Sequence, residues 1–267
     1  MKNIFQNLVL LCCLVSLPAR GQFITTITGK LNAAGTRDSC ATWGEGYPAT
    51  DAYLNSSSFA MCRDKWGNIY VGDIKTVKKI DAVVFTHHHF DHIGGFDDVR
   101  AFNFMLRKAL PIYLMQETMD NLERTFIYAF MDTGQKGGGV PVVVQHIIDK
   151  EAFRVGDIDF IPIPMMHGKM RVNGYRIGNF AYCTDTNFIS EESFALLHNL
   201  DILILDALRY ESHTTHFSVD EALAAAKRIG AKQTYFTHIA HNIKHDDLES
   251  RLPQGIAICY DGLHFEM

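Results

Sequence analysis

A cluster of histidines and one aspartate, placed directly after an apolar segment, is the feature that most constrains this chain. Residues 80–86 form a short, β-branched, apolar run of the kind found in buried strands. The run leads straight into Thr86-His87-His88-His89-Phe90-Asp91-His92. In an extended segment the side chains of residues i and i+2 share one face, so His87 and His89 can bind one metal ion.

The second half of this cluster predicts a second, neighbouring ion. Asp91 and His92 precede Ile93-Gly94-Gly95, where we expect the chain to turn sharply. Imidazole and carboxylate ligands favour zinc, manganese or iron over calcium. A run of histidines can also be an exposed low-complexity tract that traps metal by accident. That alternative requires polar surroundings, whereas this run follows a buried strand, so we favour a functional site.

Three more residues of metal-ligand type each follow an apolar, strand-like segment farther along the chain. They are His167, Asp185 and His238. Any one of them alone could be a capping or surface residue, but three of them behind the first motif rarely arise by chance.

The remaining pattern predicts an α/β fold in which early strands are followed by strands that alternate with helices, an order typical of a layered sandwich. Strands are expected at 59–62, 69–71, 160–164, 179–184, 202–205 and 233–237. Helices are expected at 96–108 and 118–131, separated by Pro111. A third helix follows Ser218, where Ser218 and Glu221 form a capping-box pattern and Gly230 ends the helix.

The histidine cluster resembles the His-x-His-x-Asp-His signature of the metallo-β-lactamase superfamily. This resemblance implies a four-layer αββα sandwich and two divalent ions, zinc or manganese. It assigns one ion to His87, His89 and His167 and the other to Asp91, His92 and His238, with Asp185 bridging and Asp91 also counted as catalytic. Two such ions, about 3.5–4 Å apart, would generate the attacking hydroxide and clamp the attacking and leaving oxygens.

Within the superfamily, residues 91–104, 166–185 and 213–218 resemble the bacterial phosphoribosyl 1,2-cyclic phosphate phosphodiesterase branch. In that branch the histidine corresponding to His216 assists catalysis, which implies that His216 protonates the leaving oxygen. Because His216 lies just before a helix N-cap, a packing role is the alternative. We favour catalysis, since a leaving alkoxide needs a positioned proton donor. His213 is expected to be structural.

These observations predict a two-metal hydrolase whose partner is a small-molecule phosphate ester, cyclic esters included. Hydrolysis of a lactone, thioester or β-lactam is the alternative activity, and an inactive metal-binding relic is the non-enzymatic one. The net charge of -5 makes a non-specific nucleic-acid binder unlikely. The assembly state stays open, with a homodimer among the options.

The amino-terminal region sets the predicted location. Residues 1–21 resemble a signal peptide, with Lys2, an apolar run and a cleavage-like segment, and this favours a periplasmic or secreted protein. The family resemblance favours the cytoplasm, and a buried first strand is the alternative for the apolar run. That run is shorter than the about 20 residues that a membrane span needs, and no later segment qualifies. Residues 22–267 are predicted to form one domain, of which 22–79 diverges from the family.

Overall fold

The first part of the chain folds around a parallel sheet. The computed structural model describes residues 8–11, 58–63, 69–73, 80–131, 139–260 and 263. A four-stranded sheet has the order β1-β4-β5-β6, with every pair parallel. Its strands are β1 (Leu8–Leu11), β4 (Ile80–Val84), β5 (Leu110–Leu114) and β6 (Val143–Ile147). The apolar β4 is buried because it has a strand on each side and packed layers on both faces.

Strands β1, β2 (Ser58–Arg63) and β3 (Ile69–Asp73) can be compared with the predictions for the signal peptide and for the first two strands. Strand β1 lies inside the segment predicted to be a signal peptide, and its pairing with β4 corresponds to the alternative of a first strand. Cleavage and export stay predictions. Strands β2 and β3 pair in antiparallel fashion, which confirms both predicted strands.

The second sheet carries most of the remaining chain. Its order is β11-β8-β9-β10-β12-β13-β14, with β7 added on β8. The pairs from β10 to β14 are parallel, so the carboxyl ends of these strands meet at one edge. The strands are β7 (Phe153–Val155), β8 (Ile158–His167), β9 (Met170–Ile177), β10 (Phe180–Cys183), β11 (Phe188–Ile189), β12 (Ile202–Asp206), β13 (Gln233–Thr237) and β14 (Ile256–Ile258).

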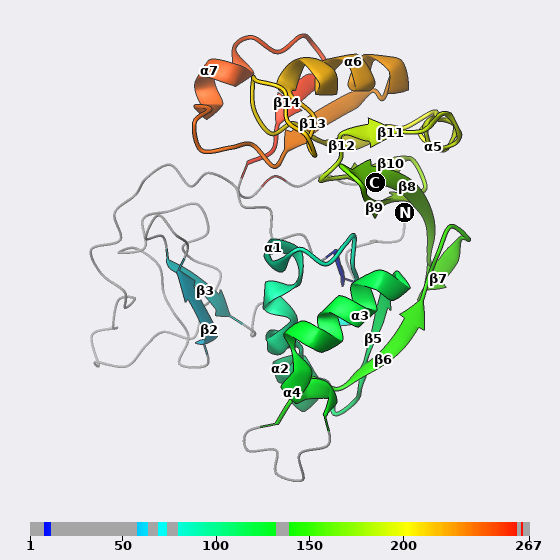
Figure 1. Ribbon diagram of the computed structural model, residues 1–267, viewed down its shortest axis with the longest axis vertical. Helices are drawn as coiled ribbons and strands as arrows, with labels where there is room; N and C mark the ends of the chain where they lie inside the picture. The colour runs from blue at the N-terminus through cyan, green and yellow to red at the C-terminus, as the bar shows by residue number, and fades with distance from the viewer. Residues whose placement is uncertain are drawn as a thin grey trace.

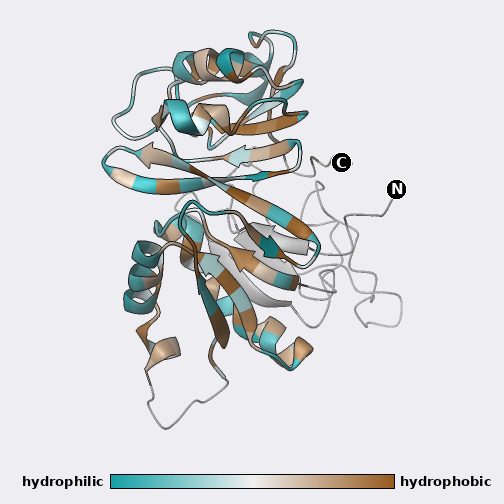
Figure 2. Cartoon of the chain, turned by 90° about the vertical axis from the view of Figure 1, so that its right-hand side faces the viewer, coloured by the Kyte–Doolittle hydropathy of each residue, from teal (hydrophilic) through white to brown (hydrophobic). Residues whose placement is uncertain are grey.

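Helices cover the outer face of each sheet (Figure 1). The first sheet carries α1 (Phe90–Ile93), the 3-10 helix η3 (Gly94–Asp98), α2 (Val99–Leu106), α3 (Gln116–Thr125) and α4 (Ile127–Phe130). The second carries α5 (Glu191–Ala195), α6 (Val219–Ile229) and α7 (His245–Glu249). Figure 2 shows the apolar residues gathered on the strands between these helical layers.

Three apolar clusters lie between these layers and hold them together. One joins the first sheet to its helices, and another joins the second sheet to α6 and α7. Between the sheets, Ala82 and Val84 of β4 pack with Phe160 and Tyr175 of β8 and β9. The predicted four-layer αββα sandwich is therefore confirmed.

Helix α6 forms as its sequence predicts. The Ser218 hydroxyl accepts a hydrogen bond from the Glu221 N–H, and the Glu221 carboxylate accepts one from the Ser218 N–H. The helix ends at Gly230, which has a left-handed φ of 69°. Its first residue, Val219, and later alanines face the core of the second sheet. The helix begins three residues after His216, and the Phe217 N–H just before it donates to the Asp206 carboxylate at the end of β12.

The prediction for residues 96–131 was wrong in one respect. We expected two helices separated only by a proline, whereas strand β5 lies between them. Pro111 lacks an N–H, yet it fits because the pairing of β4 with β5 begins at Ile112. Residue 111 therefore has no hydrogen bond to give up on that side.

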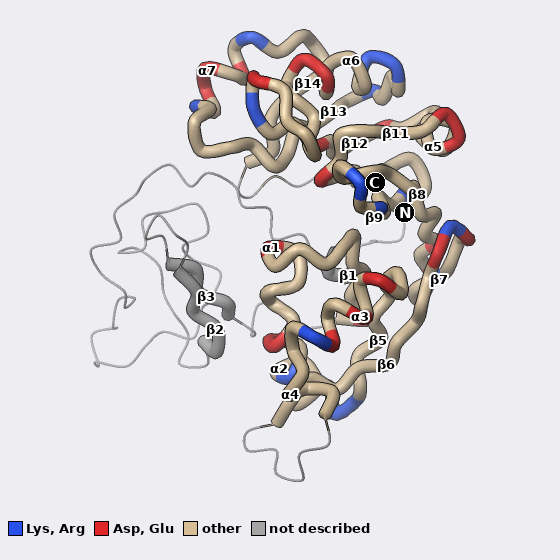
Figure 3. The backbone as a smooth tube through the Cα atoms, in the orientation of Figure 1, with Lys and Arg blue, Asp and Glu red and all other residues tan. Residues whose placement is uncertain are grey.

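Charged residues lie mainly on the outer helices, the loops and the strand pair β7–β8, with both signs interspersed (Figure 3). Examples are the ion pairs of Arg154 with Asp159 and of Lys232 with Asp201. Within the described ranges, every helix is too short or too polar to cross a bilayer.

Candidate metal centre

The ligand-type residues predicted from the sequence meet at one edge of the sandwich. His87 and His89 follow β4, and His167 is the last residue of β8. Asp185 and His238 come shortly after β10 and β13, whose parallel arrangement with β12 brings their ends together. The topology therefore places residues that are far apart in sequence side by side.

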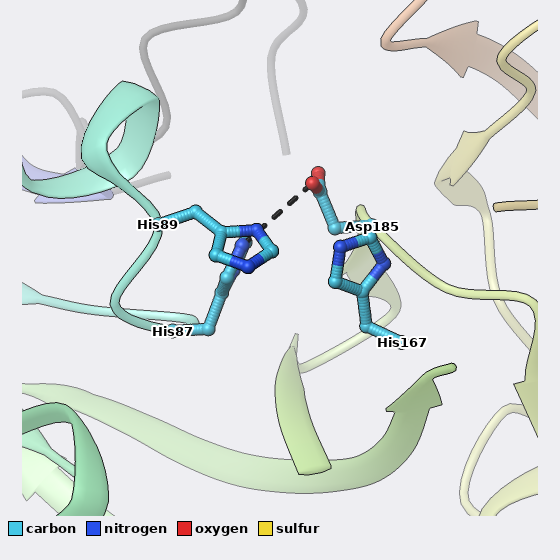
Figure 4. A group of neighbouring side chains, drawn as sticks. All are labelled: His87, His89, His167 and Asp185. Carbon is cyan, nitrogen blue, oxygen red and sulfur yellow. Dashed lines mark ion pairs between the residues drawn. The ribbon is translucent and has the colours of Figure 1, made fainter. Parts of the chain in front are cut away.

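The first cluster contains His87, His89, His167 and Asp185. One potential ligand atom from each lies within 4.8 Å of all the others. Figure 4 shows the three imidazole rings and the Asp185 carboxylate converging on a common space. The Nε2 atom of His87 is 3.7 Å from Oδ2 of Asp185. This is the set predicted for one ion, together with the predicted bridging residue.

The second cluster contains Asp91, His92, His238 and again Asp185, with ligand atoms within 4.8 Å of one another. Nε2 of His92 lies 3.3 Å from Oδ1 of Asp185, and Nε2 of His238 lies 3.5 Å from Oδ2 of Asp185. Because Oδ2 of Asp185 faces both His87 and His238 while Oδ1 faces His92, this one side chain can contribute to both clusters.

Asp91 and His92 reach the site by a different local structure from the one expected. The glycine pair does not make the turn, since Gly94 has helical angles of φ -56° and ψ -28°. Instead the chain enters helix α1 at Phe90, and the His89 carbonyl accepts hydrogen bonds from the N–H groups of His92 and Ile93. A single helical turn therefore presents Asp91 and His92.

Two of the residues in these clusters have strained backbones. Asp185 has a φ of 52° and His238 a φ of 61°, both in the left-handed region that residues other than glycine rarely adopt. Each such residue costs about 1–3 kcal/mol and persists only where its surroundings impose it. The surroundings here are the ends of β10 and β13. The strain lowers the stability of the fold, and it places both side chains in the ligand clusters.

The electrostatics of the site favour neutral histidines and charged carboxylates. Burial, with a smaller contribution from the nearby His92, lowers the pKa of His87 to about 2. Burial likewise lowers the pKa of His167 to about 4, with His216 adding to the effect. Burial acts to raise the pKa of Asp185, but the histidines around it, His92 first, hold that pKa well below its ordinary value. Neutral imidazole and ionised carboxylate are the forms that bind metal.

His238 is the exception among the histidines. Burial acts to lower its pKa, but the Asp91 carboxylate, whose Oδ2 lies 3.7 Å from Nε2, and the charges of Asp185 and Asp206 raise it to about 9. Below that pH the metal-free side chain holds a proton, and a metal that binds Nε2 must displace it.

The histidines of the first cluster fit a metal ion by a test that is independent of any relative. Nε2 of His87 is buried and has no hydrogen-bond partner within the described part of the chain. Its Nδ1 shares a hydrogen bond with the Thr86 hydroxyl at 3.1 Å. In His167, Nδ1–H donates to the Thr215 carbonyl at 2.7 Å, which leaves Nε2 as the lone-pair nitrogen. Histidines that bind metal are oriented in this way by a second hydrogen bond.

Comparison with known proteins agrees with this geometry. A family model described as the beta-lactamase superfamily domain matches residues 68–239, more than half of the 267 residues. The chain belongs to the metallo-β-lactamase superfamily. Within this superfamily, a structure described as a new diphosphatase from the PhnP family is 40% identical, with a TM-score of 0.64 and coverage of 71% of each chain. The metallo-β-lactamase fold protein YhfI from Bacillus subtilis is 21% identical, with a TM-score of 0.56 and coverage of 69% of this chain and 76% of that one, a likeness that shows the fold alone.

The curated relatives are longer than this chain. The octanoyltransferase of Porphyromonas gingivalis is 31% identical over 189 residues, which is 70% of this chain and 38% of that protein. The exodeoxyribonuclease WalJ of Streptococcus pneumoniae is 25% identical over 134 residues, which is 48% of this chain and 44% of that protein. The chain thus spans less than half the length of either relative.

A buried aspartate and His216 form a pair beside the predicted metal ligands. Asp206, the last residue of β12, is completely buried, and its Oδ1 lies 3.2 Å from Nδ1 of His216. Burial raises the pKa of Asp206, against the lowering effect of the nearby His216 and His238. The His216 ring stacks on the His238 ring with centroids 4.7 Å apart. The structure therefore places His216 next to the predicted ligands.

Asp206 was not predicted from the sequence. Its signal was available, because Asp206 ends an apolar strand as the predicted ligands do. His213, expected to be structural, accepts a hydrogen bond at Nδ1 from the Thr215 N–H at 3.3 Å.

Gly168, which follows His167, provides a first prediction. It has a φ of 65°, and a Cβ at this position would lie 2.8 Å from Cγ2 of Thr215. We expect Gly168→Ala to destabilise the chain by about 1–3 kcal/mol and to weaken metal binding by displacing His167. Urea unfolding and metal titration would measure both effects.

Gly178→Ala is the matched control for Gly168→Ala. Gly178 has a similar φ of 55° but no heavy atom within 4 Å of the added Cβ. It should show the backbone strain alone and leave metal affinity unchanged. Equal effects of the two variants would contradict a role for the contact between Gly168 and Thr215.

Proposed function

We propose that this chain is a two-metal phosphodiesterase that hydrolyses a small phosphate ester, cyclic esters included. The observation that carries the proposal is the sharing of Asp185 between two ligand clusters, with the pair of His216 and Asp206 beside them. Shared carboxylates of this kind suit a two-ion site, which favours in-line displacement at phosphorus.

The ligand assignment follows the two clusters. His87, His89 and His167 would hold one ion, Asp91, His92 and His238 the other, and Asp185 would bridge them. Zinc or manganese fits this mixture of imidazole and carboxylate. When bound, the ions supply Lewis acidity toward the phosphate oxygens and lower the pKa of a water molecule that acts as the nucleophile.

The protein's own residues would then manage the leaving group. As the bond between phosphorus and the leaving oxygen breaks, His216 donates a proton to that oxygen. The donor form is the imidazolium of His216, which donates Nδ1–H to Asp206 and carries the transferable proton on Nε2; once that proton has passed to the leaving oxygen, the neutral ring keeps Nδ1–H bonded to Asp206. The near-complete burial of His216, at 8% exposure, keeps this proton away from bulk water.

Hydrolysis of a diphosphate bond is the second candidate. The 40% identical structure is described as a diphosphatase, and the same ligand set could act on a phosphoric anhydride. When a diphosphate bond is hydrolysed, the leaving group is a phosphate. A phosphate depends less on a proton donor than an alkoxide leaving group does. The two reactions can therefore be separated by their dependence on His216.

The alternative activities predicted from the sequence can also be tested. Lactone, thioester or β-lactam hydrolysis would use the same metal ligands, and a relative named as an octanoyltransferase gives a reason to include thioesters in a substrate screen. An inactive relic would bind metal without turnover of any of these substrates.

The deciding experiment measures hydrolysis of bis(p-nitrophenyl) phosphate by metal-stripped protein before and after reloading with manganese or zinc. We expect activity only after reloading, with two ions bound per chain. Parallel assays with an alkyl diphosphate and a thioester would identify the other candidates. Two bound ions without phosphodiester turnover would contradict the proposal.

A further inference from the structure

A short segment after Asp185 connects the two parts of the site. The N–H of Asn187 donates to the Met166 carbonyl at 3.0 Å, next to the ligand His167. The Thr186 carbonyl accepts a hydrogen bond from the Phe217 N–H at 2.8 Å, next to His216. Residues 186 and 187 therefore contact both the end of β8 and the segment that carries His216.

The side chain of Asn187 uses both ends of its amide in this connection. Its Oδ1 accepts a hydrogen bond from the Gly168 N–H at 2.8 Å. Its Nδ2 donates to the Thr214 carbonyl at 2.9 Å. One side chain thus joins the turn after β8 to the segment 213–217. A donor and an acceptor are both required, and an amide supplies both.

Each of these two contacts lies next to a residue of the site. Gly168 follows His167, and Thr214 is two residues before His216. Between them, Nδ1–H of His167 donates to the Thr215 carbonyl, and Gly168 lies against the Thr215 methyl group. If the amide of Asn187 were lost, the segment 213–217 could move relative to the turn, and the hydrogen bond that orients His167 would weaken with it.

We propose that Asn187 is a positioning residue that fixes His216 relative to the metal ligands by joining the turn at Gly168 to the segment at Thr214. The inference deepens the proposed function, because the consequence for turnover rests on His216 as the proton donor. Asn187 itself touches neither set of ligand atoms through its amide. Its effect should therefore appear mainly in steps that depend on proton donation.

The kinetic test uses methyl aryl phosphates whose leaving groups range from p-nitrophenol to phenol. Phenolate is the poorer leaving group and needs the proton more. We expect Asn187→Ala to lower kcat for the phenyl ester by about 10-fold more than for the p-nitrophenyl ester. Asn187→Asp keeps the acceptor for Gly168 but cannot donate to Thr214, so it should show the same dependence on the leaving group. An equal loss on all esters would overturn the inference.

Asn179→Ala is the matched control. The Asn179 side chain donates to Asp201 at 3.3 Å, before β10, and contacts none of the site residues. It should reproduce wild-type kinetics on every ester. The assays are run at saturating metal, so that metal content stays at the wild-type level in all three variants.

A second measurement on the metal-free protein does not depend on turnover. Nitrogen-15 spectra of histidine-labelled protein report which ring nitrogen of His167 carries the proton. Wild type should show His167 protonated at Nδ1, and Asn187→Ala should show a mixture of both tautomers together with faster amide exchange at Thr215–Phe217. An unchanged spectrum would overturn the inference. If wild type hydrolyses no ester but Asn187→Ala alters this spectrum, the proposed function fails while the positioning role stands.

Discussion

Replacing Asp185 with alanine is expected to abolish metal-dependent phosphodiester hydrolysis. The two oxygens of Asp185 lie 3.3 Å from His92 and 3.7 Å from His87, so the substitution removes a ligand from both clusters at once. We expect kcat/KM to fall by about 10³-fold or more, because partners that merely support a metal ligand already contribute about 10–100-fold. Initial rates and the number of ions per chain would be measured together, and fewer than two ions should remain.

Two further variants separate the charge of Asp185 from its backbone. Asp185→Asn keeps the shape of the side chain, and asparagine also tolerates the left-handed φ of 52°. It should fold like wild type and still lose most activity. Asp201→Ala removes an exposed carboxylate before β12, paired with Lys232, and should keep full activity. Two retained ions and unchanged rates in Asp185→Ala would refute the bridging assignment.

The convergence of the candidate ligands could be predicted from sequence because most of them lie at or just after the end of an apolar strand. Parallel strands that end at one edge bring such residues together, and the sheet from β10 to β13 confirms this reasoning for Asp185 and His238. The pattern could not show how Asp91 and His92 are presented. A glycine pair suggested a turn, whereas hydrogen bonds to the His89 carbonyl form a helical turn instead.

The pairing of Asp206 with His216 could not be predicted from the periodicity of the sequence. It ends the strand β12 as the ligands end theirs, yet its partner His216 lies ten residues farther on, across a loop. Only the folded chain shows that the β-bridge between Arg209 and Ser218 and the hydrogen bond from the Leu208 N–H to the Phe217 carbonyl return this loop to the strand end. Long-range pairing of a buried carboxylate therefore required the structure.

Replacing His216 with alanine is the second change with a large expected effect. We expect kcat for an alkyl phosphodiester to fall by about 10²–10⁴-fold, the usual contribution of a positioned general acid. The number of bound ions should not change, because His216 is absent from both predicted ligand sets. The measurement compares alkyl and p-nitrophenyl esters, and the loss should be much smaller for the latter. His198→Ala, at an exposed histidine outside the site, is the control.

A variant of Asp206 tests whether this residue acts through His216. Asp206→Asn keeps an acceptor for His216 or for the Phe217 N–H, both of which bond to the present carboxylate, but removes the negative charge. It should lower kcat less than His216→Ala and with the same preference for poor leaving groups, since it acts through His216. If His216→Ala left alkyl phosphodiester turnover unchanged, the proton-donor role would be wrong. Turnover of a diphosphate or thioester by that same variant would then favour a reaction whose leaving group needs no proton.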